Sequence, residues 1–291
     1  MAVLFWAGNW VFARALRFDA PPVAIAFWRW AVALVILTPI AYPHVRAQWR
    51  TIVASSRILC VLALLATVFQ HIPVYRGLQE TTATNGALLN STTPVMILVL
   101  SRVFVGQRLT IMQGLGVVIS LVGVVLIIAR GDASVLTTLE LNRGDLFVLL
   151  ATLSWAIYTV CLRWGPADLN PVAMLWVIAS FGVAAILPLY ALELAGGRTM
   201  RMTTTALSGI FYMGAFSTVV AYIAWNRAVQ QIGPIRAGPF MYLMLIYTPL
   251  LAIVFLGERL HLYHVIGSLF IVGGIYLSVI GERLKRRSPN H

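Results

Sequence analysis

Apolar runs of about 20 residues alternate along this chain with short segments rich in Arg, Asp, Gly and Pro. An α-helix needs about 20 apolar residues to cross the hydrocarbon core of a bilayer. The runs therefore predict an all-α integral membrane protein with ten transmembrane helices, the first of them short. No cleavable leader is expected, because Met1 leads directly into the first run. The predicted spans are residues 1–16, 22–42, 58–78, 83–104, 109–129, 144–164, 171–194, 207–230, 234–255 and 263–280.

The two halves of the chain repeat one another. Trp6 recurs 149 residues later as Trp155, and the sequence GQRL at 106–109 recurs 151 residues later as GERL at 257–260. Each half holds five spans, which is an odd number, so the two copies must cross the membrane in opposite directions. This is an inverted-topology repeat, the plan of many secondary transporters, in which the substrate binds near the midplane between the halves.

The repeat and the charges predict how the chain is divided and oriented. We expect a first five-helix repeat (1–130), a connecting loop (131–143), a second five-helix repeat (144–281) and a basic cytoplasmic tail (282–291). With both termini in the cytoplasm, twelve Lys and Arg residues lie on the cytoplasmic side and eight on the other. Positive charge is enriched on the cytoplasmic side, so this orientation is favoured, in a bacterial inner membrane.

The composition agrees with a membrane protein that has little soluble structure. Apolar residues make up 60% of the chain and charged residues 10%, whereas a soluble domain has about 25% charged residues. The net charge of +12 comes mostly from Arg residues near helix ends, which is typical of interfacial anchors, so nucleic acid is not an expected partner. Cys60 and Cys161 predict neither a disulfide nor a metal site. We expect no cofactor, contact with membrane lipid, and a monomer or weak homodimer.

One span differs from the others, because Gln70, His71, Pro73 and Tyr75 fall within six residues. A polar side chain at membrane depth is costly unless it has a partner or lines a wet cavity. Pro73 cannot donate to the carbonyl of Phe69, so we expect a kink beside the polar residues. The cluster predicts part of a binding pocket; the alternative is that His71 caps a carbonyl of a neighbouring helix.

Two five-helix repeats that each carry a Gly-[Gln/Glu]-Arg-Leu motif resemble the EamA branch of the drug/metabolite transporter superfamily. Pro94 precedes Gly106 by twelve residues, and Arg29 lies in the second span, both as in the family. The second copy departs from the pattern, since Met244 stands where a proline is expected and Pro249 follows five residues later. The shape of the ninth helix is therefore left open.

The resemblance implies ten helices around a central cavity lined by helices 1, 3, 4, 6, 8 and 9, with helices 5 and 10 outside. It also implies export of amino acids and other metabolites by alternating access. The aromatic residues expected in the cavity make the protein similar to the aromatic amino-acid exporters of the YddG type.

Aromatic and amide side chains at mid-span positions are the candidate substrate-binding residues. Trp155 lies within one residue of the centre of its span, where interfacial anchoring does not explain a Trp. For Tyr222 and Tyr242, packing in the core is an equal alternative. The full set is Gln70, His71, Tyr75, Asn90, Trp155, Tyr158, Tyr222, Trp225, Asn226 and Tyr242, with Pro73, Pro94 and Pro239 as hinge or kink positions.

This set favours a ligand with apolar bulk and a few polar groups. An aromatic amino acid could stack on Trp155 or Tyr75, place its ammonium over a ring face, and accept hydrogen bonds on its carboxylate from Gln70, His71 or Asn226. Since side-chain amides and rings select loosely, we expect a broad range of neutral amino acids.

The positions of the nine acidic residues limit the mechanism. All lie near predicted helix ends or in loops, whereas an exporter of lipophilic cations usually needs a carboxylate at membrane depth. Lipophilic cations are therefore not expected as substrates. Proton coupling would have to use His71 or be absent, and we favour a facilitator, with proton-coupled efflux through His71 as the alternative.

Other functions are less well supported by the sequence. An intramembrane enzyme would need paired Asp, a Ser–His pair or a zinc motif, none of which is present at depth, so the protein is not expected to be an enzyme. A scaffold would not need two inverted repeats. A carrier of purines or nucleotide sugars would want Lys or Arg in the cavity. Arg29 and Arg227 are the candidates, and we expect both towards the cytoplasmic end or on a packing face.

Overall fold

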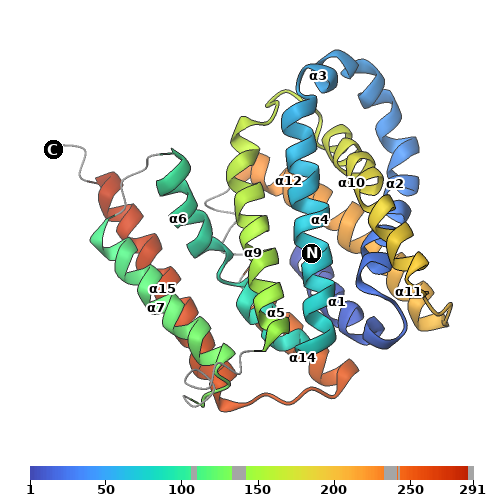
Figure 1. The fold of residues 1–291 in the computed structure, drawn as a ribbon. Coiled ribbons are helices and arrows are strands. Elements are labelled where there is room, and N and C mark those ends of the chain that lie inside the picture. Colours follow the sequence, from blue (N-terminus) through green and yellow to red (C-terminus); the bar gives the residue numbers. More distant parts are fainter. Residues whose placement is uncertain (106–109, 133–141, 233–240, 242, 288–291) are drawn as a thin grey trace.

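The computed structural model describes residues 1–105, 110–132, 142–232, 241 and 243–287; within these, the side chains of 101, 105, 226, 229–232 and 278–287 are not described. Every regular element in the described ranges is a helix (Figure 1). The elements are α1 (Ala2–Ala15), η1 (Leu16–Phe18), α2 (Pro22–Ala47), α3 (Trp49–Ala54), α4 (Ser56–Glu80), α5 (Ala83–Asn90), α6 (Thr93–Val105), α7 (Ile111–Ile128), α9 (Arg143–Cys161), η2 (Leu162–Trp164), α10 (Pro171–Ala195), α11 (Thr204–Tyr212), η3 (Met213–Val220), α12 (Ala221–Ile232), α14 (Met244–Leu256) and α15 (Leu262–Arg287).

Seven helical segments of the described chain are long and apolar enough to cross a membrane. They are Pro22–Ala47, Ser56–Glu80, Ala83–Phe104, Ile111–Ile128, Arg143–Trp164, Pro171–Ala195 and Thr204–Trp225, and shorter apolar helices cover Met244–Leu256 and Leu262–Leu277. These segments confirm the prediction of an all-helical membrane protein. That the predicted spans at 1–16, 234–255 and 263–280 also cross the membrane stays a prediction.

The predicted span 83–104 is divided into α5 and α6 by a turn at Ser91 and Thr92. Three consecutive hydroxyls, those of Ser91, Thr92 and Thr93, each donate a hydrogen bond to the carbonyl three residues earlier, at 2.5–2.7 Å. Such local bonds to backbone carbonyls compete with the helical ladder. Pro94 is the second residue of α6, where its missing N–H costs little, so the break precedes the proline.

Pro73 and Pro239 are the other two proposed hinge or kink positions. Helix α4 is unbroken from Ser56 to Glu80 and includes Pro73, so the proline does not end the helix. Pro239 lies outside the described residues.

The predicted span 207–230 contains a π-helix that the sequence analysis did not anticipate. Helix α11 leads into η3, a π-helix of eight residues, and η3 leads into α12. Within it, Thr218 Oγ1 donates a 2.9 Å hydrogen bond to the carbonyl of Met213, five residues back. π-Helical turns are rare and frequently lie at functional sites.

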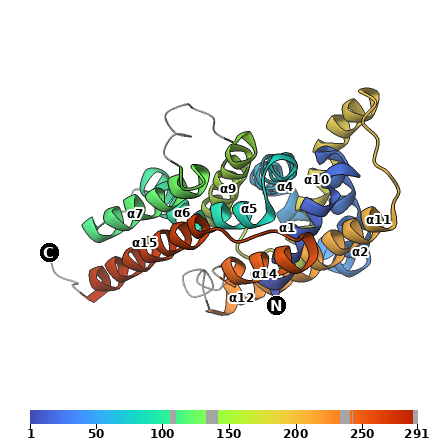
Figure 2. The same ribbon diagram turned by 90° about the horizontal axis from the view of Figure 1, so that it is seen from below.

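Helices α7 and α15 form an antiparallel pair at one side of the molecule (Figures 1 and 2). Small residues bring the two helices together: a side chain at Gly123 would collide with the carbonyl oxygen of Gly267, and Ser120 Oγ donates to the carbonyl of Ile271 at 3.2 Å. The small residues of this segment are therefore used for close packing within the chain, as in other membrane helix pairs.

Helices α2 and α10 pack along each other and exchange caps at their ends. The carboxylate of Glu193, near the end of α10, accepts from the N–H of Ala24 at 2.8 Å in the first turn of α2. At the opposite end, Gln48 Oε1 accepts from the N–H of Asn170, the N-cap of α10, at 2.9 Å. Each helix thus ends beside the beginning of the other, which fixes their antiparallel arrangement.

Candidate functional site

A narrow cavity of about 40 Å³ lies among helices from both halves of the chain. A buried water needs roughly 10–15 Å³ of such space, so this cavity holds a few waters, and an amino acid would require the surrounding helices or side chains to move. Its lining residues are Trp6, Asn9, Trp10, Arg29, Gln70, His71, Val74, Asn90, Trp155, Tyr222, Met241 and Met244.

Aromatic rings form one wall of the cavity. The Trp6 ring lies 6.4 Å from Trp155, 5.8 Å from Tyr222 and 5.4 Å from Trp225, measured between ring centroids. The contacts with Trp155 and Tyr222 are edge-on, a favoured geometry for aromatic pairs. Trp6 Nε1 donates a 3.0 Å hydrogen bond to the carbonyl of Ser217 in η3, so the π-helix orients this ring.

Trp155 is supported from behind by Tyr158, one turn later on α9. The two rings are stacked, with centroids 4.9 Å apart and planes 21° from parallel. Tyr158 itself is buried and does not line the cavity. Its position therefore fixes the orientation of Trp155 without offering a surface to a ligand in this conformation.

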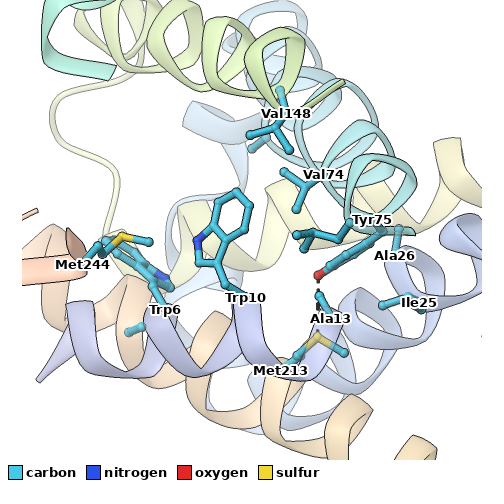
Figure 3. Close-up of a cluster of buried hydrophobic side chains, with 14 of the residues drawn as sticks. Trp6, Trp10, Ala13, Ile25, Ala26, Val74, Tyr75, Val148, Met213 and Met244 are labelled. Atoms are coloured by element: carbon cyan, nitrogen blue, oxygen red, sulfur yellow. Dashed lines mark hydrogen bonds between the residues drawn. The ribbon is translucent and has the colours of Figure 1, made fainter. Parts of the chain in front are cut away.

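Apolar side chains from α1, α4 and α14 complete the wall. In Figure 3, Trp10 lies between Trp6 and Val74, and Met244 lies beside Trp6. Behind this layer, the hydroxyl of Tyr75 points to the sulfur of Met213 at 3.8 Å. The cavity thus combines apolar and aromatic side chains with about as many polar ones, among them Asn9, Arg29, Gln70, His71 and Asn90.

Arg29 is the most unusual polar group at the cavity, because its guanidinium is only 1% exposed. Its Nε donates to Thr218 Oγ1 at 2.7 Å. Its Nη1 donates to Asn9 Oδ1 at 2.9 Å and to the hydroxyl of Tyr75 at 2.7 Å. One cation therefore ties α2 to α1, α4 and η3 through neutral acceptors.

His71 is 3% exposed and lies one turn from Tyr75, with its ring edge-on to Trp30 at 5.5 Å. Its Nδ1 lies 2.6 Å from the carbonyl oxygen of Ala66, five residues earlier on the same helix. A carbonyl only accepts hydrogen bonds, so Nδ1 carries the hydrogen, and in the neutral ring Nε2 is an acceptor. His71 thus caps a carbonyl of its own helix, rather than one of a neighbouring helix.

The structure brings half of the predicted substrate-binding residues to the cavity. Gln70, His71, Asn90, Trp155 and Tyr222 line it. Three others, Tyr75, Tyr158 and Trp225, do not line it but contact a residue that does. The side chain of Asn226 and all of Tyr242 lie outside the described residues.

Arg29 lies on a face of α2 that packs against α1, α4 and η3, which is one of the two expectations, and it also lines the cavity, which was not expected. The π-helix supplies Thr218 as a buried acceptor, and no sequence pattern indicated it. Asn9, Trp10, Val74 and Met244 were also not among the predicted site residues. A stricter rule, that any ionisable residue inside a span is a candidate functional residue, would have found Arg29.

Apolar helices, a polar cavity between them and a buried cation together define a membrane transport protein. The chain belongs to the EamA-like transporter family, which matches residues 1–129 and 142–280, and thereby to the drug/metabolite transporter superfamily. Members of this family are transporters, which fits the prediction that the protein is not an enzyme.

Several relatives cover nearly the same length. The chain is 22% identical over 254 residues to the Bacillus subtilis protein named "Uncharacterized transporter YyaM", covering 87% of this chain and 83% of that protein. It is 26% identical over 282 residues to an uncharacterized transporter of Archaeoglobus fulgidus, with 96% of each chain covered. A solved structure titled "Crystal structure of protein" is 19% identical with a TM-score of 0.62, covering 96% of this chain and 94% of the other. That last likeness shows the fold alone.

Proposed function

We propose that this transporter exports neutral amino acids, aromatic ones among them, with a broad range that extends to related metabolites. The observation that carries the proposal is the wall formed by Trp6, Trp155 and Tyr222 beside the polar groups of Gln70 and His71. Rings that pack edge-on in a cavity offer faces and edges to an aromatic side chain. This pattern is what a YddG-like aromatic amino-acid exporter would need.

Alternating access between two inverted repeats, 1–130 and 144–281, is the proposed mechanism. Three observations support it. The family matches the two halves separately, the cavity is lined from both halves, and α2 and α10, the second helices of the two halves, exchange caps at opposite ends. With an odd number of spans in each half, rocking of one half against the other opens the cavity to alternate sides. Both termini are placed in the cytoplasm, in a bacterial inner membrane, on the Lys and Arg distribution.

The proposed energetics are those of a facilitator. The described residues include no carboxylate at the cavity, and His71 already uses one ring nitrogen within its own helix. Proton-coupled efflux through His71 is the alternative, because a histidine can take a proton from cavity water without a second titrating group.

A second candidate substrate class is an anionic metabolite, such as a purine derivative or a nucleotide sugar. The observation that favours it is the guanidinium of Arg29 at the cavity, since Arg binds phosphate and carboxylate groups well. The aromatic wall suits a purine ring as well as an amino-acid side chain.

Uptake into proteoliposomes tests these proposals together. Radiolabelled neutral amino acids, a purine nucleoside and a nucleotide sugar are compared, each with and without an imposed pH gradient, against liposomes without protein. We expect saturable uptake of phenylalanine, tryptophan and leucine that equilibrates and does not follow the pH gradient. Uptake of the nucleotide sugar alone would replace the amino-acid proposal by the anionic one.

A further inference from the structure

We infer that Arg29 anchors the carboxylate of the substrate, while Gln70 and His71 accept hydrogen bonds from its ammonium group. This assignment rests on the proposed function and goes beyond it, because it states which residues recognise the carboxylate of an amino acid and which recognise its ammonium group. It also reverses the expectation that Gln70 and His71 serve the carboxylate.

The first step is the charge of Arg29. A guanidinium stays protonated in proteins, and burial of a charge is costly unless the charge is paired. The described hydrogen bonds from Arg29 all go to neutral oxygens, those of Asn9, Tyr75 and Thr218. A carboxylate entering the cavity would supply the missing negative charge.

The second step concerns the N–H groups of the guanidinium that have no acceptor among the described residues. Its Nε and Nη1 are occupied by the three bonds, and no described residue accepts from Nη2. Two N–H groups therefore remain on a side chain that lines the cavity. The existing bonds hold the planar group in place, so a ligand carboxylate meets a preorganised donor, which lowers the entropic cost of binding.

The third step concerns two acceptors on α4. Gln70 lines the cavity, and its Oε1 is buried without a hydrogen-bond partner. His71 donates from Nδ1 to the carbonyl of Ala66, which leaves Nε2 as an acceptor in the neutral ring. Two acceptors on successive residues of α4 thus lie at the same cavity as the cation of α2, a pattern that matches the two charges of an α-amino acid.

The pattern separates substrates by their charged groups. A simple amine would place a second positive charge beside Arg29 and would have no carboxylate to bind it. A carboxylic acid without an amine keeps the bond to Arg29 and loses only the weaker hydrogen bonds to Gln70 and His71. The order of affinity for one side chain is therefore amino acid first, carboxylic acid second, and amine or amino-acid amide last.

Ligand binding to the purified wild-type protein tests this order without requiring transport. Thermal stabilisation in detergent is titrated with phenylalanine, 3-phenylpropionate, phenylalaninamide and 2-phenylethylamine, since a ligand that binds the folded state raises the unfolding temperature by mass action. We expect phenylalaninamide and 2-phenylethylamine to bind about tenfold more weakly than phenylalanine or worse, as one lost charge-assisted hydrogen bond implies. Equal binding of phenylalanine and phenylalaninamide, or no binding of any of the four, would overturn the assignment.

Variants of Arg29 test whether this residue causes the order of ligand affinities. In Arg29→Gln, phenylalanine and phenylalaninamide are expected to bind within about twofold of each other, whereas Arg29→Lys keeps part of the preference for phenylalanine. The exposed Arg46→Gln is the matched control and keeps the wild-type order. Should Arg29→Gln not fold, the wild-type titration still decides. If carboxylates bind in the expected order but proteoliposomes do not take up amino acids, the anchor stands and the proposed function fails.

Discussion

Arg29 Nε and Thr218 Oγ1 are joined by a 2.7 Å hydrogen bond across 189 residues of sequence. Thr218 lies in the π-helix η3 and is fully buried, and its hydroxyl donates a hydrogen bond to the carbonyl of Met213. The bond therefore links the second helix of one half of the chain to the irregular helix of the other half. It holds the cation at the cavity.

Replacing Thr218 by Val should destabilise the protein by about 1–2 kcal/mol. The side chain keeps its shape, but Arg29 Nε loses its acceptor in a buried place. Thermal unfolding in detergent measures the effect. The matched control is Thr152→Val, because the hydroxyl of Thr152 bonds only to the carbonyl of Val148 within its own helix. Equal effects of the two substitutions would contradict a special role for Thr218.

Removing the ring in Trp155→Ala should lower the affinity for aromatic and large apolar amino acids by roughly twofold to tenfold, since aromatic pairs contribute about 0.5–1.5 kcal/mol beyond burial. Concentration-dependent uptake in proteoliposomes measures it. Trp164→Ala is the control, because that ring is 49% exposed and away from the cavity. Unchanged transport by well-folded Trp155→Ala would show that the ring is not part of the site.

His71→Gln should retain part of the transport activity, because a glutamine both donates and accepts hydrogen bonds. Wild-type flux should not follow an imposed pH gradient if His71 only binds substrate. Counterflow with equal pools and gradient-driven uptake are measured side by side. Accumulation by the wild type that is driven by pH and lost in His71→Gln would instead assign the coupling proton to this residue.

Glu258 should contribute to stability and not to transport. Its carboxylate accepts from the N–H groups of Ala83 and Thr84, at 2.8 and 3.0 Å, at the beginning of α5. Glu258→Ala removes this cap and should cost about 1–2 kcal/mol in a thermal unfolding experiment. Glu80→Ala, which breaks only the surface ion pair with Arg76, should cost less than about 1 kcal/mol. A larger loss in Glu80→Ala than in Glu258→Ala would contradict this account.

Hydropathy predicted an all-helical membrane protein correctly, because each apolar run must satisfy its backbone within a helix. Pro94 was predicted as a hinge or kink position and lies just after the turn at Ser91 and Thr92, whereas the π-helix was not predicted. In both the turn at Ser91 and the π-helix at Met213–Val220, a hydroxyl group donates to a nearby backbone carbonyl, and a hydropathy pattern does not report such bonds.

The predicted residues that line the cavity stand out within their own spans, whereas the lining residues that were not predicted depend on how several helices meet. Gln70 and His71 stand out within one span, and the structure places both at the cavity. Arg29 needed acceptors from three other elements before burial was tolerable, and Trp10 lines the cavity only because of how α1 faces α4 and α14. Such information lies in the packing of helices that are distant in sequence.

The central claim is that an amino acid occupies the cavity walled by Trp6 and Trp155. Photolabelling with p-azidophenylalanine in proteoliposomes, followed by mass spectrometry of the peptides, tests it most directly. The account predicts adducts on peptides of α1, α4 and α9 that contain the cavity residues, and their loss when excess phenylalanine is present. Adducts that phenylalanine does not displace, or displaceable adducts confined to other helices, would contradict it.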